Sequence, residues 1–189
     1  DSALRYSREP DFAEWGHRLE VHGLDLRHTQ SVEDFCRTIA TRHDRLDYII
    51  NNACQTVRRP PEFYRHMMEI ETASLRELPS DAAALLVGDT ELGTSAVELA
   101  AGGGPVRSAE LSQVPLLPDD AQHALELFPG GQLDQDLQQV DLRERNSWRL
   151  TLAEVSSVEL LETQLVNAVA PFVLNARLKP LMLRTPERD

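Results

Sequence analysis

The stretch Leu46-Asp47-Tyr48-Ile49-Ile50-Asn51-Asn52-Ala53 decides the fold that we expect for this chain. Its first five residues form a nearly continuous apolar run that is rich in aromatic and β-branched side chains, and two asparagines end the run. Such a run is typical of a parallel strand that other layers cover on both faces. We therefore expect a buried strand over residues 46–50.

A second strand and a helix are expected before this run. Apolar and polar residues alternate ahead of a polar turn, which predicts a short strand near residues 19–24. Ser31 is then followed three positions later by an acidic residue, and apolar residues recur at helical spacing, which predicts a helix over about 32–43. Strand, helix and strand form a βαβ unit. Residues 1–65 are thus expected to be part of a Rossmann-like, doubly wound parallel sheet of the α/β class.

Residues 66–150 differ from the rest of the chain in charge. The chain has 31 acidic residues against 19 basic ones, and positions 66–146 hold 15 of the acidic residues but only 4 arginines. Glycine and proline clusters interrupt this stretch, including Gly102-Gly103-Gly104-Pro105. We expect a long, largely irregular acidic insertion that stays at the surface, because burying unpaired carboxylates costs several kcal/mol each, by order of magnitude.

Residues 151–189 are expected to return to the Rossmann domain as one long helix. Thr151 and Glu154 have the spacing of a capping box, and a broad apolar face follows as far as about residue 183. Pro171 lies inside this helix and has no N–H group. The helix is therefore expected to kink there or to leave the carbonyl of Asn167, four residues earlier, without its usual donor.

Three of these features together resemble the short-chain dehydrogenase/reductase family. That family has an Asp and an aliphatic residue after its third strand, Asn-Asn-Ala-Gly after its fourth strand, and an Asn in the next long helix. The corresponding residues here are Asp25-Leu26, Asn51-Asn52-Ala53-Cys54 and Asn167. Cys54 departs from the pattern, since it puts a side chain where the family has glycine.

The resemblance implies an oxidoreductase that uses NAD or NADP and acts on a small-molecule alcohol or carbonyl substrate. It assigns Asn167 as a catalytic residue, with a water that passes protons, and implies that a homo-oligomer can form. It assigns cofactor binding to four residues, of which the first would meet the adenine amino group and the last two would line the ribose: Asp25, Leu26, Asn51 and Ala53.

Two motifs of that family do not occur in these 189 residues. The glycines do not have the Gly-x-x-x-Gly-x-Gly spacing that binds pyrophosphate, and none of the three tyrosines is followed four positions later by Lys. The chain is therefore interpreted as an internal fragment that is inactive in isolation. Residues that choose between NAD and NADP are expected to precede it.

Composition argues against nucleic acid, a membrane span and a metal site. With a net charge of −12 and a single lysine, Lys179, the chain is a poor ligand for nucleic acid. No stretch is apolar for long enough to span a membrane. Two cysteines without metal spacing favour a reducing, cytoplasmic location and no metal site.

Some alternatives stay open at this point. The chain could be a non-catalytic interaction protein of the same fold that binds a partner through the acidic insertion, or an acidic helical regulatory module without dinucleotide ancestry. Arg58 and Arg59 could hold an anion or belong to an ordinary surface loop. Pro171 could mark a proton relay or an ordinary helix kink.

Overall fold

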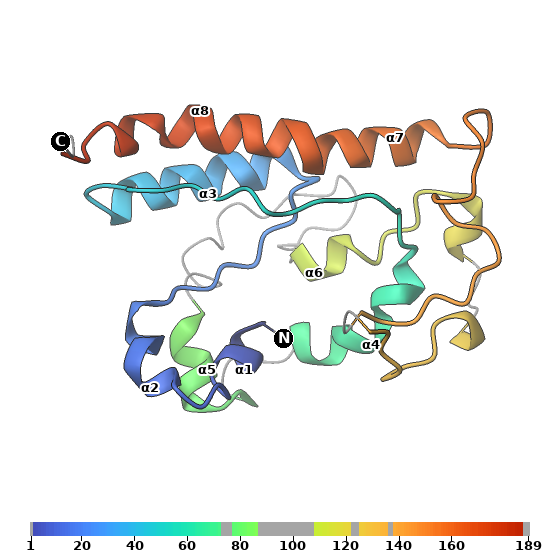
Figure 1. The fold of residues 1–189 in the computed structure, drawn as a ribbon, viewed down its shortest axis with the longest axis horizontal. Helices are drawn as coiled ribbons and strands as arrows, with labels where there is room; N and C mark the ends of the chain where they lie inside the picture. Colours follow the sequence, from blue (N-terminus) through green and yellow to red (C-terminus); the bar gives the residue numbers. More distant parts are fainter. Residues whose placement is uncertain (1, 73–76, 87–107, 122–124, 136–137, 187–189) are drawn as a thin grey trace, which may run out of the picture. The chain divides into compact units, whose positions relative to one another are not determined.

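The structure is a computed structural model that describes residues 2–72, 77–86, 108–121, 125–135 and 138–186. These residues are mainly helical (Figure 1). The chain divides into two compact units. The first unit comprises residues 1–23, 61–115 and 123–140, and the second comprises residues 24–60, 116–122 and 141–189.

The first unit is built from short helices. They are α1 (Ser2–Tyr6), α2 (Phe12–Trp15), η1 (Gly16–Arg18), α4 (Pro61–Glu71), α5 (Ser80–Leu85), α6 (Ser108–Leu111) and η4 (Leu125–Leu127). Ala3, Ala82 and Leu85 form its buried cluster, against which partly buried apolar side chains pack. Around α4, Phe63 meets Phe128 edge to face, with ring centroids 5.9 Å apart.

The second unit contains two long helices, of 14 and 13 residues, and three shorter elements. They are α3 (Thr29–Arg42), η3 (Pro118–Ala121), α7 (Ser157–Gln164), the π-helical η5 (Leu165–Val169) and α8 (Ala170–Met182). Helix α3 packs against α8 (Figure 1). Val32 and Cys36 of α3 and Leu178 and Leu181 of α8 are buried.

Helix α3 confirms the helix expected over about 32–43, although it begins three residues earlier. His28 is its N-cap, and the His28 side chain accepts a hydrogen bond from the Ser31 N–H group. A ring nitrogen in this position satisfies one of the free N–H groups of the first turn. The cap is therefore His28 rather than Ser31.

The prediction of a parallel, Rossmann-like sheet is wrong. Among the described residues there is no β-strand, and only two isolated bridges occur, Val21 with Leu86 and Leu133 with Gln139. Residues 46–50 belong to no strand, and Tyr48 and Ile50 are 69% and 86% exposed. An apolar run forms a buried strand only if neighbouring strands take up its backbone hydrogen bonds and other layers cover its faces. The described part of the chain supplies neither.

The expected long helix begins later than the capping box at Thr151 suggests. The Glu154 carboxylate does accept from the Thr151 N–H group at 2.8 Å, but residues 152–154 form only a turn. Helix α7 is instead capped by Ser156, whose side chain accepts from the Glu159 N–H group. Two Ser/Thr-x-x-Glu signals follow one another here, and the second starts the helix.

Candidate functional site

Some of the predicted site residues, among them Asn51 and Asn167, lie along one strip of the second unit. Residues 46–58, here called segment 46–58, run beside α8, η5 and α7 in the opposite direction. The Leu46 N–H group donates to the Leu181 carbonyl at 3.3 Å, and the Asn51 amide donates to the Asn175 side chain at 3.2 Å. Segment 46–58 therefore takes helices as its neighbours where a strand was expected.

Asn167 fastens the middle of this segment. The Gln55 N–H group donates to Asn167 Oδ1 at 2.8 Å, and Asn167 Nδ2 donates to the Gln55 carbonyl at 2.8 Å. A side-chain amide that pairs with both polar groups of one residue fixes that backbone as a neighbouring strand would. Asn167 thus holds the end of the Asn51-Asn52-Ala53-Cys54 stretch against η5.

The backbone around Asn167 is irregular at the place where Pro171 predicts it. Residues 165–169 form a π-helical turn, in which the Ala170 N–H group bonds to the Leu165 carbonyl five residues earlier. Pro171 follows and cannot donate a hydrogen bond into this turn. Single π-helical turns within α-helices are frequent at functional sites, so the turn gives Asn167 a backbone setting unlike the rest of α7 and α8.

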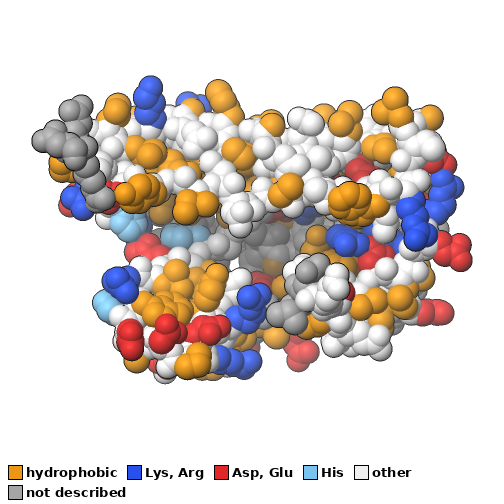
Figure 2. All heavy atoms as spheres, in the orientation of Figure 1, with side chains coloured by type: hydrophobic (Ala, Val, Ile, Leu, Met, Phe, Trp, Pro, Cys, Tyr) orange, Lys and Arg blue, Asp and Glu red, His pale blue; other side chains and the backbone are white. Residues whose placement is uncertain are grey.

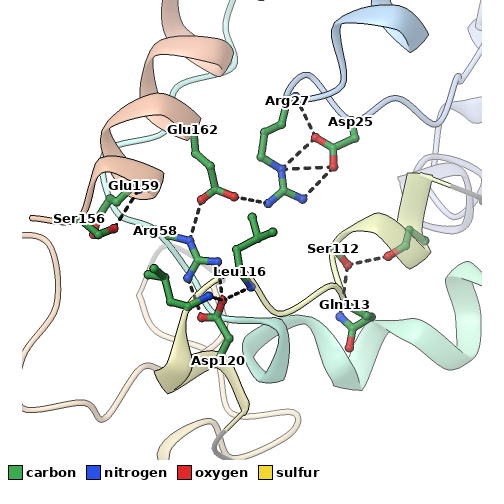
Figure 3. A network of polar contacts seen from close by, with 12 residues as sticks. Asp25, Arg27, Arg58, Ser112, Gln113, Leu116, Asp120, Ser156, Glu159 and Glu162 are labelled. Atoms are coloured by element: carbon green, nitrogen blue, oxygen red, sulfur yellow. Dashed lines mark hydrogen bonds and ion pairs between the residues drawn. The ribbon is translucent and has the colours of Figure 1, made fainter. Parts of the chain in front are cut away.

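A cluster of buried charges lies at the other end of segment 46–58 (Figure 3). Arg58 is only 8% exposed. Its Nε donates to Glu162 of α7 at 2.7 Å, and its Nη1 and Nη2 donate to the two carboxylate oxygens of Asp120 at 2.6 and 2.7 Å. Carboxylates therefore bind both edges of the guanidinium, in the fork geometry that suits arginine.

Glu162 links this arginine to a second one. Arg27 Nη1 donates to Glu162 at 2.9 Å, while Arg27 Nη2 and Nε bond the Asp25 carboxylate at 2.7 to 3.2 Å. The hydrogen bond to Asp25, set against the cost of burial, raises the pKa of Arg27 above its usual range. We call the five joined residues Asp25, Arg27, Arg58, Asp120 and Glu162 the Arg58 cluster.

Arg59 is also occupied by a carboxylate. It pairs with Asp141, and Arg143 Nη2 donates to the same carboxylate at 2.8 Å. The sequence left open whether Arg58 and Arg59 hold an anion. In the structure both bind acidic side chains of this chain.

The titration of Asp120 follows from these contacts. Burial by itself would raise the pKa of its carboxyl group, but the hydrogen bonds from Arg58 and from the N–H groups of Leu116 and Leu117 outweigh burial and hold the pKa below its ordinary value. A lowered pKa in the folded state means that ionised Asp120 stabilises the fold.

We therefore expect the Asp120 contribution to stability to be complete above the ordinary Asp pKa of about 4 and to disappear as the pH falls through its lowered pKa. The melting temperature of the chain should be measured from pH 7 to pH 3, with Asp120→Asn beside it. The variant should lose part of the acid-side slope. Equal slopes in both proteins would show that Asp120 is not ionically paired.

The predicted site residues are only partly brought together. Asn51 lies on the same strip as Asn167, and Ala53 lies between Asn51 and the clamped Gln55 with its side chain exposed. Asp25 reaches α7 only through Arg27 and Glu162, and Leu26 is half-buried beside it.

Two of the side chains assigned to the cofactor already have partners within this chain. The Asp25 carboxylate, assigned to an adenine amino group, already accepts from the backbone N–H and the guanidinium of Arg27. The Asn51 side chain, assigned to the ribose, donates to Asn175. The groups that would recognise the adenosine half are thus engaged with other side chains.

Sequence reasoning missed most of the Arg58 cluster. Arg58 was singled out, but Arg27, Asp120 and Glu162 were not. One signal was available for Glu162: with Glu159 it has i, i+3 spacing on a helix whose other residues include two leucines and a valine. Both glutamates are buried, at 5% and 9% exposure. The partners themselves lie 62 and 104 residues from Arg58 and follow no spacing rule.

Comparisons with known proteins give this chain no relative. It matches no protein-family model, no curated protein and no solved structure. Within the described ranges, no helix is long and apolar enough to cross a membrane, and no group of three His, Cys, Asp or Glu side chains is placed to hold a metal ion.

Proposed function

We propose that these 189 residues are part of an NAD(P)-dependent oxidoreductase that acts on a small-molecule alcohol or carbonyl compound in the cytoplasm. One observation supports the proposal above others. The end of the Asn51-Asn52-Ala53-Cys54 stretch and Asn167 lie more than 110 positions apart in the chain, and two hydrogen bonds of 2.8 Å join Gln55 to Asn167. The resemblance assigns these two stretches to one active site.

The proposed contribution of this chain is to position groups rather than to carry the whole reaction. Asn167 holds the backbone next to the predicted cofactor-binding residues, and Pro171 prevents the π-helical turn from closing in the regular way. The proton donor and the pyrophosphate-binding turn would come from residues other than these. The cofactor, when bound, would supply the hydride chemistry.

The 189-residue chain alone should show no dehydrogenase activity and no micromolar affinity for NADH or NADPH. Pyrophosphate binding needs a glycine turn at a helix N-terminus, which this sequence does not have, and the Asp25 carboxylate is already paired with Arg27. Fluorescence titration with each nucleotide measures this. A micromolar dissociation constant for the isolated chain would refute the fragment interpretation.

The function itself is tested on a longer protein. The coding sequence on both sides of these residues should encode a Gly-x-x-x-Gly-x-Gly turn upstream and a Tyr-x-x-x-Lys motif downstream. A protein that includes both should oxidise NADH or NADPH in the presence of members of an aldehyde and ketone panel. Finding neither motif would favour the alternative, a non-catalytic protein that binds a partner through its acidic stretch. That alternative has fewer carboxylates to offer than the sequence suggests, because Asp120 and Asp141 are paired internally.

A further inference from the structure

We propose that the ion pair between Asp120 and Arg58 is a latch, which fastens residues 116–121 to the second unit and opens without unfolding that unit. The proposal does not depend on the proposed function. Residues 61–115 and 123–140 belong to the first unit, whereas the short stretch between them, residues 116–122, belongs to the second.

The stretch is fastened through a charge and not through apolar packing. Asp120 is the only buried residue among positions 114–120, with 7% of it exposed, whereas Leu116 is 49% exposed and Pro118 and Asp119 are also exposed. The Asp120 carboxylate accepts from both Nη atoms of Arg58 and from the N–H groups of Leu116 and Leu117 at 2.8 and 2.9 Å. One side chain thus joins this stretch both to Arg58 and to its own backbone.

The charges that remain after Asp120 leaves are balanced. Arg58 keeps its 2.7 Å contact with Glu162, and Arg27 keeps Glu162 and Asp25. Two guanidinium groups then face two carboxylates, whereas with Asp120 bound the Arg58 cluster carries one carboxylate more than it has guanidinium groups (Figure 3). Removing one partner of a buried pair is costly when it leaves a buried charge uncompensated. Here the departing residue is the surplus one, and it goes to water.

The surroundings of Arg58 are held independently of Asp120. The Arg58 N–H group donates to the Ser147 hydroxyl at 3.1 Å, and Arg143 Nη2 donates to the Arg58 carbonyl at 3.3 Å. Glu162 lies within α7. The cap of that helix is Ser156, which accepts a hydrogen bond from the Glu159 N–H group and does not involve Asp120. Opening of the latch is therefore expected to be a local event, confined to residues 116–121.

Hydrogen exchange at single-residue resolution tests this in the 189-residue protein. Asp120→Asn keeps the size of the side chain and removes its charge. Because hydrogen bonds to charged groups contribute roughly 1.5–3 kcal/mol, exchange of the Leu116 and Leu117 amides should become about 10- to 100-fold faster, while amides of α7 keep their wild-type rates. Glu144→Gln is the matched control, since it removes a charge from an exposed side chain of the same unit and should leave both regions within about two-fold of wild type.

Two results would overturn the latch. One is an unchanged rate at Leu116 and Leu117 in Asp120→Asn. The other is equal acceleration across residues 116–121 and α7, which would make Asp120 a part of the core. If the variant does not fold, the wild-type protein decides: the amides of Leu116 and Leu117 should open with a lower free energy than those of α7, and equal opening free energies would contradict a local latch.

Figure 2 shows apolar side chains on the surface of the molecule. Leu161 of α7 and Phe172 of α8 are 61% and 71% exposed.

Discussion

Replacing Arg58 with alanine is expected to lower the free energy of unfolding by about 3–5 kcal/mol, because it leaves Asp120 and Glu162 buried without their shared cation. The side chains of the three residues are 2–8% exposed while the latch is closed, so water reaches the lost contacts only when residues 116–121 open. Glu162 keeps Arg27 and Asp120 keeps two backbone N–H groups, which places the loss nearer the lower end of that range.

Urea unfolding followed by circular dichroism measures this loss. Arg145→Ala serves as the control, because Arg145 is 63% exposed and pairs with the exposed Glu154, so its removal should cost less than about 1 kcal/mol. A cost for Arg58→Ala no larger than that of the control would show that the buried pairs do not form in solution.

Helical elements were predictable where their signals are local. The apolar residues of α3 recur at helical spacing, and that pattern needs no knowledge of the partner, which is α8. The start of α7 was less predictable, because the signals at Thr151 and Ser156 are equivalent in sequence. Which of the two begins the helix depends on tertiary contacts in the folded chain, such as the hydrogen bond of the Ser147 hydroxyl to the Glu159 carboxylate.

The strand predicted over 46–50 does not form, because its burial depends on distant parts of the chain and not on a local signal. Its apolar composition describes what the run would bury, but burial depends on neighbours that the run does not specify. In the structure its first residue bonds to the carbonyl of Leu181, and Asn51 bonds to Asn175. Helix α8 thus takes the place of a strand, and Tyr48 and Ile50 stay exposed.

In the candidate site, too, the local features were predictable and the long-range contacts were not. Pro171 has no N–H group, so the sequence predicts an irregular backbone near Asn167, and residues 165–169 form a π-helical turn. The pairing of Asn167 with Gln55 spans 112 positions and is set by how segment 46–58 runs along the helices. No spacing within the sequence encodes that distance.

Asn167→Leu is expected to lower turnover by about 10² to 10⁴ in a protein that carries the glycine turn and the Tyr-x-x-x-Lys motif together with these residues. Leucine has about the same size but cannot pair with the Gln55 backbone, so both 2.8 Å hydrogen bonds are lost. If Asn167 positions a water for proton transfer, kcat should fall while the affinity for NADH changes little. Pro171→Ala should lower kcat by less, because it restores an N–H donor to the helix but leaves the asparagine in place.

Steady-state kinetics and nucleotide titration of both variants separate the two roles of Asn167. A residue that only fastens segment 46–58 would, when replaced, weaken nucleotide binding and stability together, because Asn51 and Ala53 lie on the segment that it holds. Asn167→Asp helps here: its carboxylate can still accept from the Gln55 N–H group but cannot donate to the Gln55 carbonyl. Full turnover in Asn167→Leu would make the residue structural and would leave the proton-transfer assignment without support. A loss in kcat at unchanged nucleotide affinity, partly restored in Asn167→Asp, would place Asn167 in the reaction itself.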